Sequence, residues 1–189
     1  MSRKPENVFI ASVHRLLPPV TLLYRMKNNN DYNSGIADCW YSGPRGDLWI
    51  EYKFLELPKR DKTIIDLVGG KDPMITPLQQ QWLAERLNEG RDCWVIVGCK
   101  DGGALFKKQQ WGTPLATVEF KRLLKTRAEL ATLIEEHVGV LDEPLASVYN
   151  DQGPQRGVSD RVNVDAARVH RKARVETTAE WLARKAKNH

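Results

Sequence analysis

The stretch GIADCWYSGPRGDLWIEYKF (residues 35–54) contains two short apolar runs that are interrupted by charged side chains. Asp38 lies in the first run, and Glu51 and Lys53 lie in the second. The aromatic and β-branched residues of both runs are typical of β-strands, and GPRGD (43–47) between them predicts a tight turn of five residues. We therefore expect an antiparallel hairpin that carries charges in the middle of a sheet.

The alternation of side chains along a strand places these charges together. Residues two apart share a face, so Glu51 and Lys53 project from one face, and pairing of the predicted strands 36–42 and 48–54 brings Asp38 close to Glu51. Two carboxylates in a partly buried place repel each other unless a cation lies between them. Carboxylate oxygens suit Mg²⁺ or Mn²⁺, and a neighbouring lysine completes a set for metal-assisted hydrolysis, as in the cleavage of phosphodiesters. The same alternation puts Trp49 on the face of the charges and Ile50, Tyr52 and Phe54 on the other.

The segments around the hairpin predict an α/β fold, a mixed sheet covered by helices. The expected elements are a helix (5–17), a strand (20–27), the hairpin, a long loop (55–75), a helix (76–90) and strands at 93–99 and 101–108. Thr76 suits the N-cap of the second helix and Gly90 suits its C-terminal end. The apolar stripe of that helix is expected to consist of Leu78, Trp82, Leu83 and Leu87.

The pattern changes near residue 114, where a first domain (1–113) is expected to end. An amphipathic helix is predicted over 117–138, a polar linker over 139–161 and a basic helical stretch over 164–189. The C-terminal part (114–189) is therefore expected to form a helical extension.

Composition limits the class of protein. The chain has 189 residues, a net charge of +5, a pI of about 9.1, 41% hydrophobic and 28% charged residues, which is ordinary for a soluble globular protein with a mild preference for polyanions. It contains neither a signal-peptide pattern nor a transmembrane run, and its three cysteines lack the paired spacing of a zinc site. A cytoplasmic protein is expected, without a membrane partner. Four tryptophans are predicted in the core (Trp40, Trp49, Trp82 and Trp94), and His14 is expected at the surface or lightly packed.

A family resemblance appears at this point. Gly35-x-x-Asp38, a short hairpin and Glu51-Tyr52-Lys53 together resemble the PD-(D/E)XK nuclease signature, and the element order matches its αβββαβ core. TPLQQQWL, with Gln79 three residues before Trp82, resembles the glutamine motif of the virus-type replication–repair (VRR-NUC) branch. KNNNDYNSGIADCWYSG and WIEYKF are similar to small nuclease-like proteins of bacteriophages. The resemblance covers roughly residues 5–110, and Ala37 stands where the family usually has a proline that shapes the backbone.

The resemblance implies a role for each matching residue. Asp38, Glu51 and the backbone carbonyl of Tyr52 would bind the divalent metal, Mg²⁺ or Mn²⁺. Lys53 would position the attacking water or stabilise the transition state, and Gln79 would orient Lys53 or a substrate phosphate.

The sequence allows two interpretations of several other charged residues. Glu6 could reach a metal-bound water, or it could be a first-turn acid that favours the helix dipole. Basic residues of the long loop and of the tail could contact phosphates, or they could be solvated surface: Lys59, Arg60, Lys62, Lys71, Arg171, Lys172 and Arg174.

The function expected from these observations is a metal-dependent deoxyribonuclease with DNA as partner, branched or flapped DNA included. Two alternatives remain open: a nuclease fold that binds nucleic acid without cleaving it, and a phage factor that binds a host protein through the C-terminal helices. Those helices could also form a homodimer.

Overall fold

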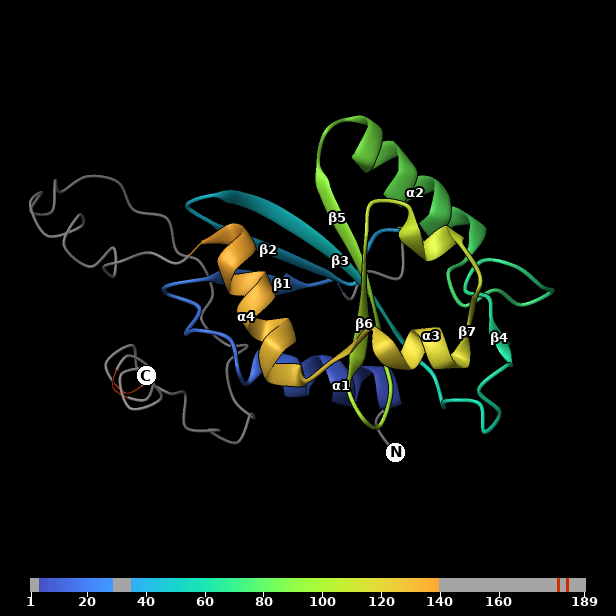
Figure 1. The fold of residues 1–189 in the computed structure, drawn as a ribbon. Helices are drawn as coiled ribbons and strands as arrows, with labels where there is room; N and C mark the ends of the chain where they lie inside the picture. The colour runs from blue at the N-terminus through green and yellow to red at the C-terminus, as the bar shows by residue number, and fades with distance from the viewer. Residues whose placement is uncertain (1–3, 29–34, 140–179, 181–182, 184–189) are drawn as a thin grey trace, which may run out of the picture.

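A computed structural model describes residues 4–28, 35–139, 180 and 183. Its centre is a mixed sheet in the order β1-β2-β3-β5-β6-β8 (Figure 1). Only β3 and β5 pair in parallel within this sheet, and its other neighbouring strands pair antiparallel. The strands are β1 (Tyr24–Lys27), β2 (Cys39–Gly43), β3 (Gly46–Phe54), β5 (Asp92–Gly98), β6 (Gly103–Lys107) and β8 (Leu124–Lys125), and a separate pair joins β4 (Ile64–Ile65) to β7 (Leu115–Ala116). The predicted α/β fold with a mixed central sheet is confirmed.

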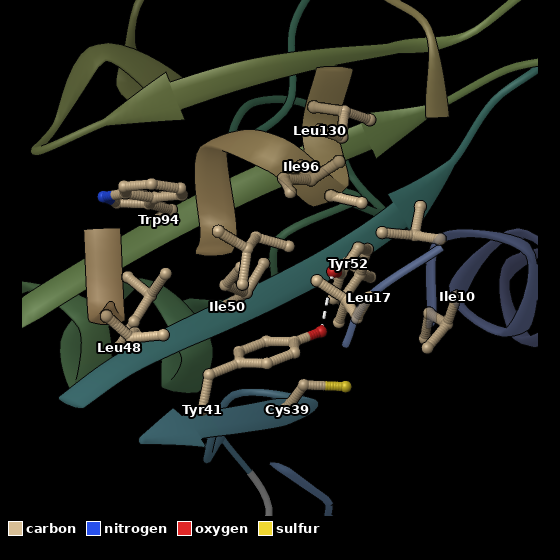
Figure 2. Close-up of a cluster of buried hydrophobic side chains, with 14 of the residues drawn as sticks. Ile10, Leu17, Cys39, Tyr41, Leu48, Ile50, Tyr52, Trp94, Ile96 and Leu130 are labelled. Carbon is tan, nitrogen blue, oxygen red and sulfur yellow. Dashed lines mark hydrogen bonds between the residues drawn. The ribbon is translucent and has the colours of Figure 1, made fainter. Parts of the chain in front are cut away.

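Helices cover both faces of the sheet. The helices α1 (Pro5–His14) and α4 (Arg127–Val138) pack on one face, where Phe9 and Leu130 join a core that also contains Tyr41 and Tyr52 (Figure 2). The other face is covered over β5 and β6 by α2 (Pro77–Asn88), α3 (Thr117–Arg122) and the short 3-10 helix η1 (Gln110–Gly112). The sheet therefore separates two apolar cores.

The two central strands behave as their sequences predict. β5 is buried from Cys93 to Gly98, as expected of an apolar strand that is covered on both faces. In β3, Leu48, Ile50 and Tyr52 belong to the core under α1 and α4, so Trp49, Glu51 and Lys53 project from the opposite face. The predicted alternation is confirmed.

The ends of three N-terminal elements differ from the prediction. The hairpin turn has two residues instead of five, because Gly43 pairs with Gly46 and the ladder continues to the turn. The first strand begins at Tyr24, since the N–H groups of Leu22 and Leu23 both donate to the carbonyl of Pro19 and form a turn. Likewise, the second strand begins at Cys39, and the first helix ends at His14.

The helix predicted over 117–138 is wrong. The chain forms α3, then β8, whose Leu124 pairs with Ala104, and then α4. Thr126 and Glu129 form a capping box at the start of α4, and this T-x-x-E pattern is a sequence signal that could have revealed the break.

The domain boundary after residue 113 stays a prediction, although two elements that follow it pack with elements that precede it. α4 contributes Leu130, Ile134 and Val138 to the core that contains α1, and β8 belongs to the main sheet. We therefore expect the first domain to extend at least as far as Val138. The predicted linker beyond Gly139 and the predicted basic helical stretch lie outside the described residues, except for residues 180 and 183.

The second helix has the predicted caps. Thr76 caps α2, and Gly90 follows its end with a φ of 76°. Its stripe is only partly as predicted, because Leu83 is buried whereas Leu78 is 53% exposed. Within the described residues, no helix has the length and apolar character needed to cross a membrane.

Candidate active site

Asp38 and Glu51 are neighbours in space. Asp38 directly precedes β2, and Glu51 lies in the second half of β3. Cys39 pairs with Ile50, so Asp38 comes opposite Glu51 on the neighbouring strand. Asp38 Oδ2 accepts a hydrogen bond of 2.8 Å from the backbone N–H of Tyr52. The hairpin thus brings the two carboxylates together on one face of the sheet, and a backbone donor holds one of them.

Glu51 is fully buried, and its two oxygens differ in their partners. Oε1 accepts hydrogen bonds from Lys53 Nζ at 2.7 Å and from Gln79 Nε2 at 2.5 Å. Oε2 is buried and has no hydrogen-bond partner among the described residues. Because a buried oxygen without a partner costs free energy, Oε2 marks a place where a further ligand would be favourable.

The electrostatics of the site also favour a cation. Burial raises the pKa of Glu51 to about 8, and the negative charge of Asp38 adds to this rise while Lys53 opposes it. Burial also raises the pKa of Asp38, against the hydrogen bond from Tyr52. Burial and the charge of Asp38 raise the pKa of Glu6, which is therefore within electrostatic range of the pair. A bound cation would relieve the cost of ionising these groups.

Gln79 is held at both ends of its side-chain amide. Its Oε1 accepts a 3.0 Å hydrogen bond from the N–H of Thr76 within the capping box of α2, and its Nε2 donates to Glu51. The structure therefore places Gln79 on the carboxylate of Glu51, and its link to Lys53 is the oxygen that both side chains share.

The donor atoms of the site suit a hard cation that keeps some of its water. Among the described residues, no group of three or more His, Cys, Asp and Glu side chains is arranged to hold a metal ion. Asp38 and Glu51 supply two carboxylates, and the carbonyl of Tyr52 lies on the same edge of β3 as its N–H, which donates to Asp38. Mg²⁺ commonly takes one or two carboxylates and several waters, so this set fits such an ion.

A buried chain of hydrogen bonds supports the site from the other face of the sheet. His14 Nε2 lies 2.7 Å from the hydroxyl of Tyr41. That hydroxyl lies 2.8 Å from the hydroxyl of Tyr52 (Figure 2). Burial, aided by the positive charge of Arg25, lowers the pKa of His14 to about 4. His14, which was expected at the surface or lightly packed, is partly buried against Tyr41.

The structure describes only part of the basic residues that are predicted to contact phosphates. Four basic residues of the segment after β3 are exposed: Lys59, Arg60, Lys62 and Lys71. Arg171, Lys172 and Arg174 lie outside the described residues.

Sequence reasoning missed Lys27, which donates to Asn7 at 2.5 Å and opposes the rise in the pKa of Asp38. Of the tryptophans expected in the core, Trp94 is buried, but Trp40, Trp49 and Trp82 are only partly buried.

Comparisons with known proteins show a structural likeness but no likeness in sequence. No family model matches the chain, and no curated protein matches it. Among solved structures, the chain is similar to Hjc of Archaeoglobus fulgidus, a Holliday junction resolvase from an archaeal hyperthermophile, with 13% sequence identity and a TM-score of 0.42. The alignment covers 68% of this chain and 97% of Hjc. A likeness at this level assigns no activity to the chain.

Proposed function

We propose that this protein is a divalent-metal-dependent nuclease that hydrolyses phosphodiester bonds of DNA. The observation that carries the proposal is the buried Oε2 of Glu51, which has no hydrogen-bond partner among the described residues and belongs to a carboxylate beside Asp38. A hard cation at this place would partner the orphaned oxygen and offset the repulsion between the two carboxylates.

Each residue of the site would have a distinct task. Asp38, Glu51 and the Tyr52 carbonyl would hold Mg²⁺ or Mn²⁺, which would supply an activated water and Lewis-acid stabilisation of the phosphate. Lys53 is 15% exposed, so its ammonium group can face both Glu51 and a phosphate that carries developing negative charge. Gln79 would keep the carboxylate of Glu51 in one orientation.

Glu6 has a more distant role in this proposal. It lies within electrostatic range of Asp38 and Lys53, which supports a contact through a metal-bound water. It is also the acidic residue in the first turn of α1, so the favourable interaction with the helix dipole applies as well.

The substrate is proposed from the distribution of charge. Lys59, Arg60, Lys62 and Lys71 are exposed on the segment that follows β3 directly after the site, where phosphates could bind in a salt-dependent way. The proposal also includes branched or flapped DNA as the preferred form of substrate and a relationship to VRR-NUC-type phage nucleases. It further includes a homodimer or a host-protein partner.

The test is a panel of labelled single-stranded, duplex, flapped and four-way DNA with Mg²⁺ or Mn²⁺. We expect cleavage that EDTA abolishes and that falls about 100-fold or more in Asp38→Ala and Lys53→Ala. Lys100→Ala, which removes an exposed lysine elsewhere, should cleave like the wild type. Cleavage in EDTA, full activity of Lys53→Ala, or no cleavage of any form with either metal would contradict the proposal.

A DNA-binding module without catalysis is the second candidate. It is favoured by the ammonium group of Lys53, which already neutralises one oxygen of Glu51 at 2.7 Å, and by the lack of a three-residue metal cluster in the described part of the chain. This candidate predicts tight DNA binding that is equal with Mg²⁺ and with EDTA, and no cleavage.

A further inference from the structure

Four aromatic side chains form a row on the face of the sheet that carries Glu51. The ring centroids of neighbours lie 5.7 Å apart for Tyr24 and Trp40, 6.3 Å for Trp40 and Trp49, and 5.2 Å for Trp49 and Trp82. We call these four residues the aromatic row. It crosses β1, β2 and β3 and ends on α2.

Part of this row has no cover in the described part of the chain. α1 and α4 pack against the opposite face of β2 and β3, and α2 packs against β5 (Figure 1). Tyr24 is 59% exposed, and Met26, which pairs with Trp40 and therefore shares its face, is 50% exposed. Large exposed apolar surface of this kind commonly marks a binding site.

The aromatic row is continuous with the candidate active site. Trp49 precedes Glu51 by two residues on β3, and Trp40 follows Asp38 by two residues. Residues two apart on a strand share a face and lie about 7 Å apart along it. A chain-like ligand that lies on the rings would therefore pass beside the site, about 7 Å from Asp38 and Glu51 along the strands.

We propose that the aromatic row is a stacking surface for unpaired nucleobases, so that the substrate is DNA with a single-stranded segment beside the bond to be cut. This inference rests on the proposed function for its link to cleavage. Stacking of bases on aromatic side chains is the usual way in which proteins bind single strands without sequence preference. Bases inside a duplex stack on each other, so a duplex cannot use the row in this way.

The charges around the row agree with this occupant. The guanidinium of Arg86 lies 5.7 Å from the ring centre of Trp82, and Lys53 follows Trp49 by four residues on the same face of β3. Beside Trp49, a cavity of about 200 Å³ is lined by Asp47, Trp49, Gly90, Arg91 and Asp92. Asp47 shares the strand face of Trp49, so its carboxylate can accept hydrogen bonds from the amino groups of bases.

The test measures binding in EDTA, so that it does not depend on cleavage. Fluorescence anisotropy of a labelled oligo-dT and of a matched duplex is recorded with the wild-type chain, Tyr24→Ala, Tyr24→Phe and Ile64→Ala. Ile64 is a matched control because it is 60% exposed on β4, outside the row. We expect Tyr24→Ala to weaken binding of the single strand about tenfold, while Tyr24→Phe, Ile64→Ala and the duplex change less than twofold.

Other outcomes would overturn the proposal. Unchanged single-strand binding by Tyr24→Ala would do so, as would an equal loss of binding to the duplex. Tighter binding of the single strand by Tyr24→Ala would indicate that the C-terminal segment of the chain occupies the aromatic row. A molecular mass in light scattering that is lower for Tyr24→Ala than for the wild type would indicate that a second copy of the chain occupies it. If Tyr24 matters for binding but no DNA is cleaved with Mg²⁺ or Mn²⁺, the proposed function fails and the stacking surface stands. If cleavage occurs and Tyr24 is irrelevant, only the stacking surface fails.

Discussion

Replacement of Glu51 by glutamine should change how stability depends on pH. Burial raises the pKa of this carboxyl to about 8, against an ordinary value of 4.5. Because the folded state holds the proton more tightly, the contribution of Glu51 to stability is fully present below pH 4.5 and is lost as pH rises through 8. At about 1.4 kcal/mol for each pH unit in this window, metal-free wild type should lose about 2.5 kcal/mol between pH 5 and pH 7 from this residue. Glu51→Gln cannot lose it, because an amide does not titrate.

The assay is urea unfolding in EDTA at pH 5, 6 and 7, for wild type, Glu51→Gln and the exposed control Glu56→Gln. The free energy of unfolding of wild type minus that of Glu51→Gln should fall by about 2.5 kcal/mol from pH 5 to pH 7. The difference is the quantity to use, because His14 acts in the opposite sense: its lowered pKa of about 4 makes stability fall as pH falls from 6.5. Glu56→Gln should follow the wild type. A difference between wild type and Glu51→Gln that stays constant within about 0.5 kcal/mol would refute the reasoning that burial dominates at Glu51.

Two further predictions concern the partners of the site. Tyr41→Phe leaves His14 and Tyr52 without the hydroxyl that they share, so we expect a loss of about 1–3 kcal/mol in urea unfolding at pH 7; unchanged stability would show that the buried chain of hydrogen bonds contributes little. Gln79→Glu keeps an acceptor for the cap of α2 but replaces the donor to Glu51 by a carboxylate, so the metal-free variant should lose more stability at pH 8 than at pH 5, and an equal loss at both pH values would contradict this.

Local rules explain the parts of the fold that the sequence predicted well. The alternation along β3 is a property of the extended chain, so it correctly separated Glu51 and Lys53 from Tyr52 before any partner was known. The caps of α2 at Thr76 and Gly90 depend on neighbouring residues alone. The break in the helix predicted over 117–138 also has a local signal, because a capping box begins a new helix at Thr126.

Longer-range features of the site lay beyond such rules. The hydrogen bond between Gln79 and Glu51 joins residues that are 28 apart in sequence, and it exists because β3 and β5 pair in parallel and α2 packs over β5. His14 is partly buried because α1 places it against Tyr41. Neither packing arrangement can be read from periodicity, which says that a face is buried but not what covers it.

The amino-acid sequence by itself thus determined the α/β class, the hairpin and the face on which Asp38, Glu51 and Lys53 meet, since each follows from the geometry of one strand or one turn. The tertiary structure alone decided which oxygen of Glu51 has hydrogen-bond partners, that α4 packs in the same core as α1, and which residue of the aromatic row is most exposed. These features depend on which elements pack together and which faces remain open, and such contacts come into being only when distant parts of the chain share one core.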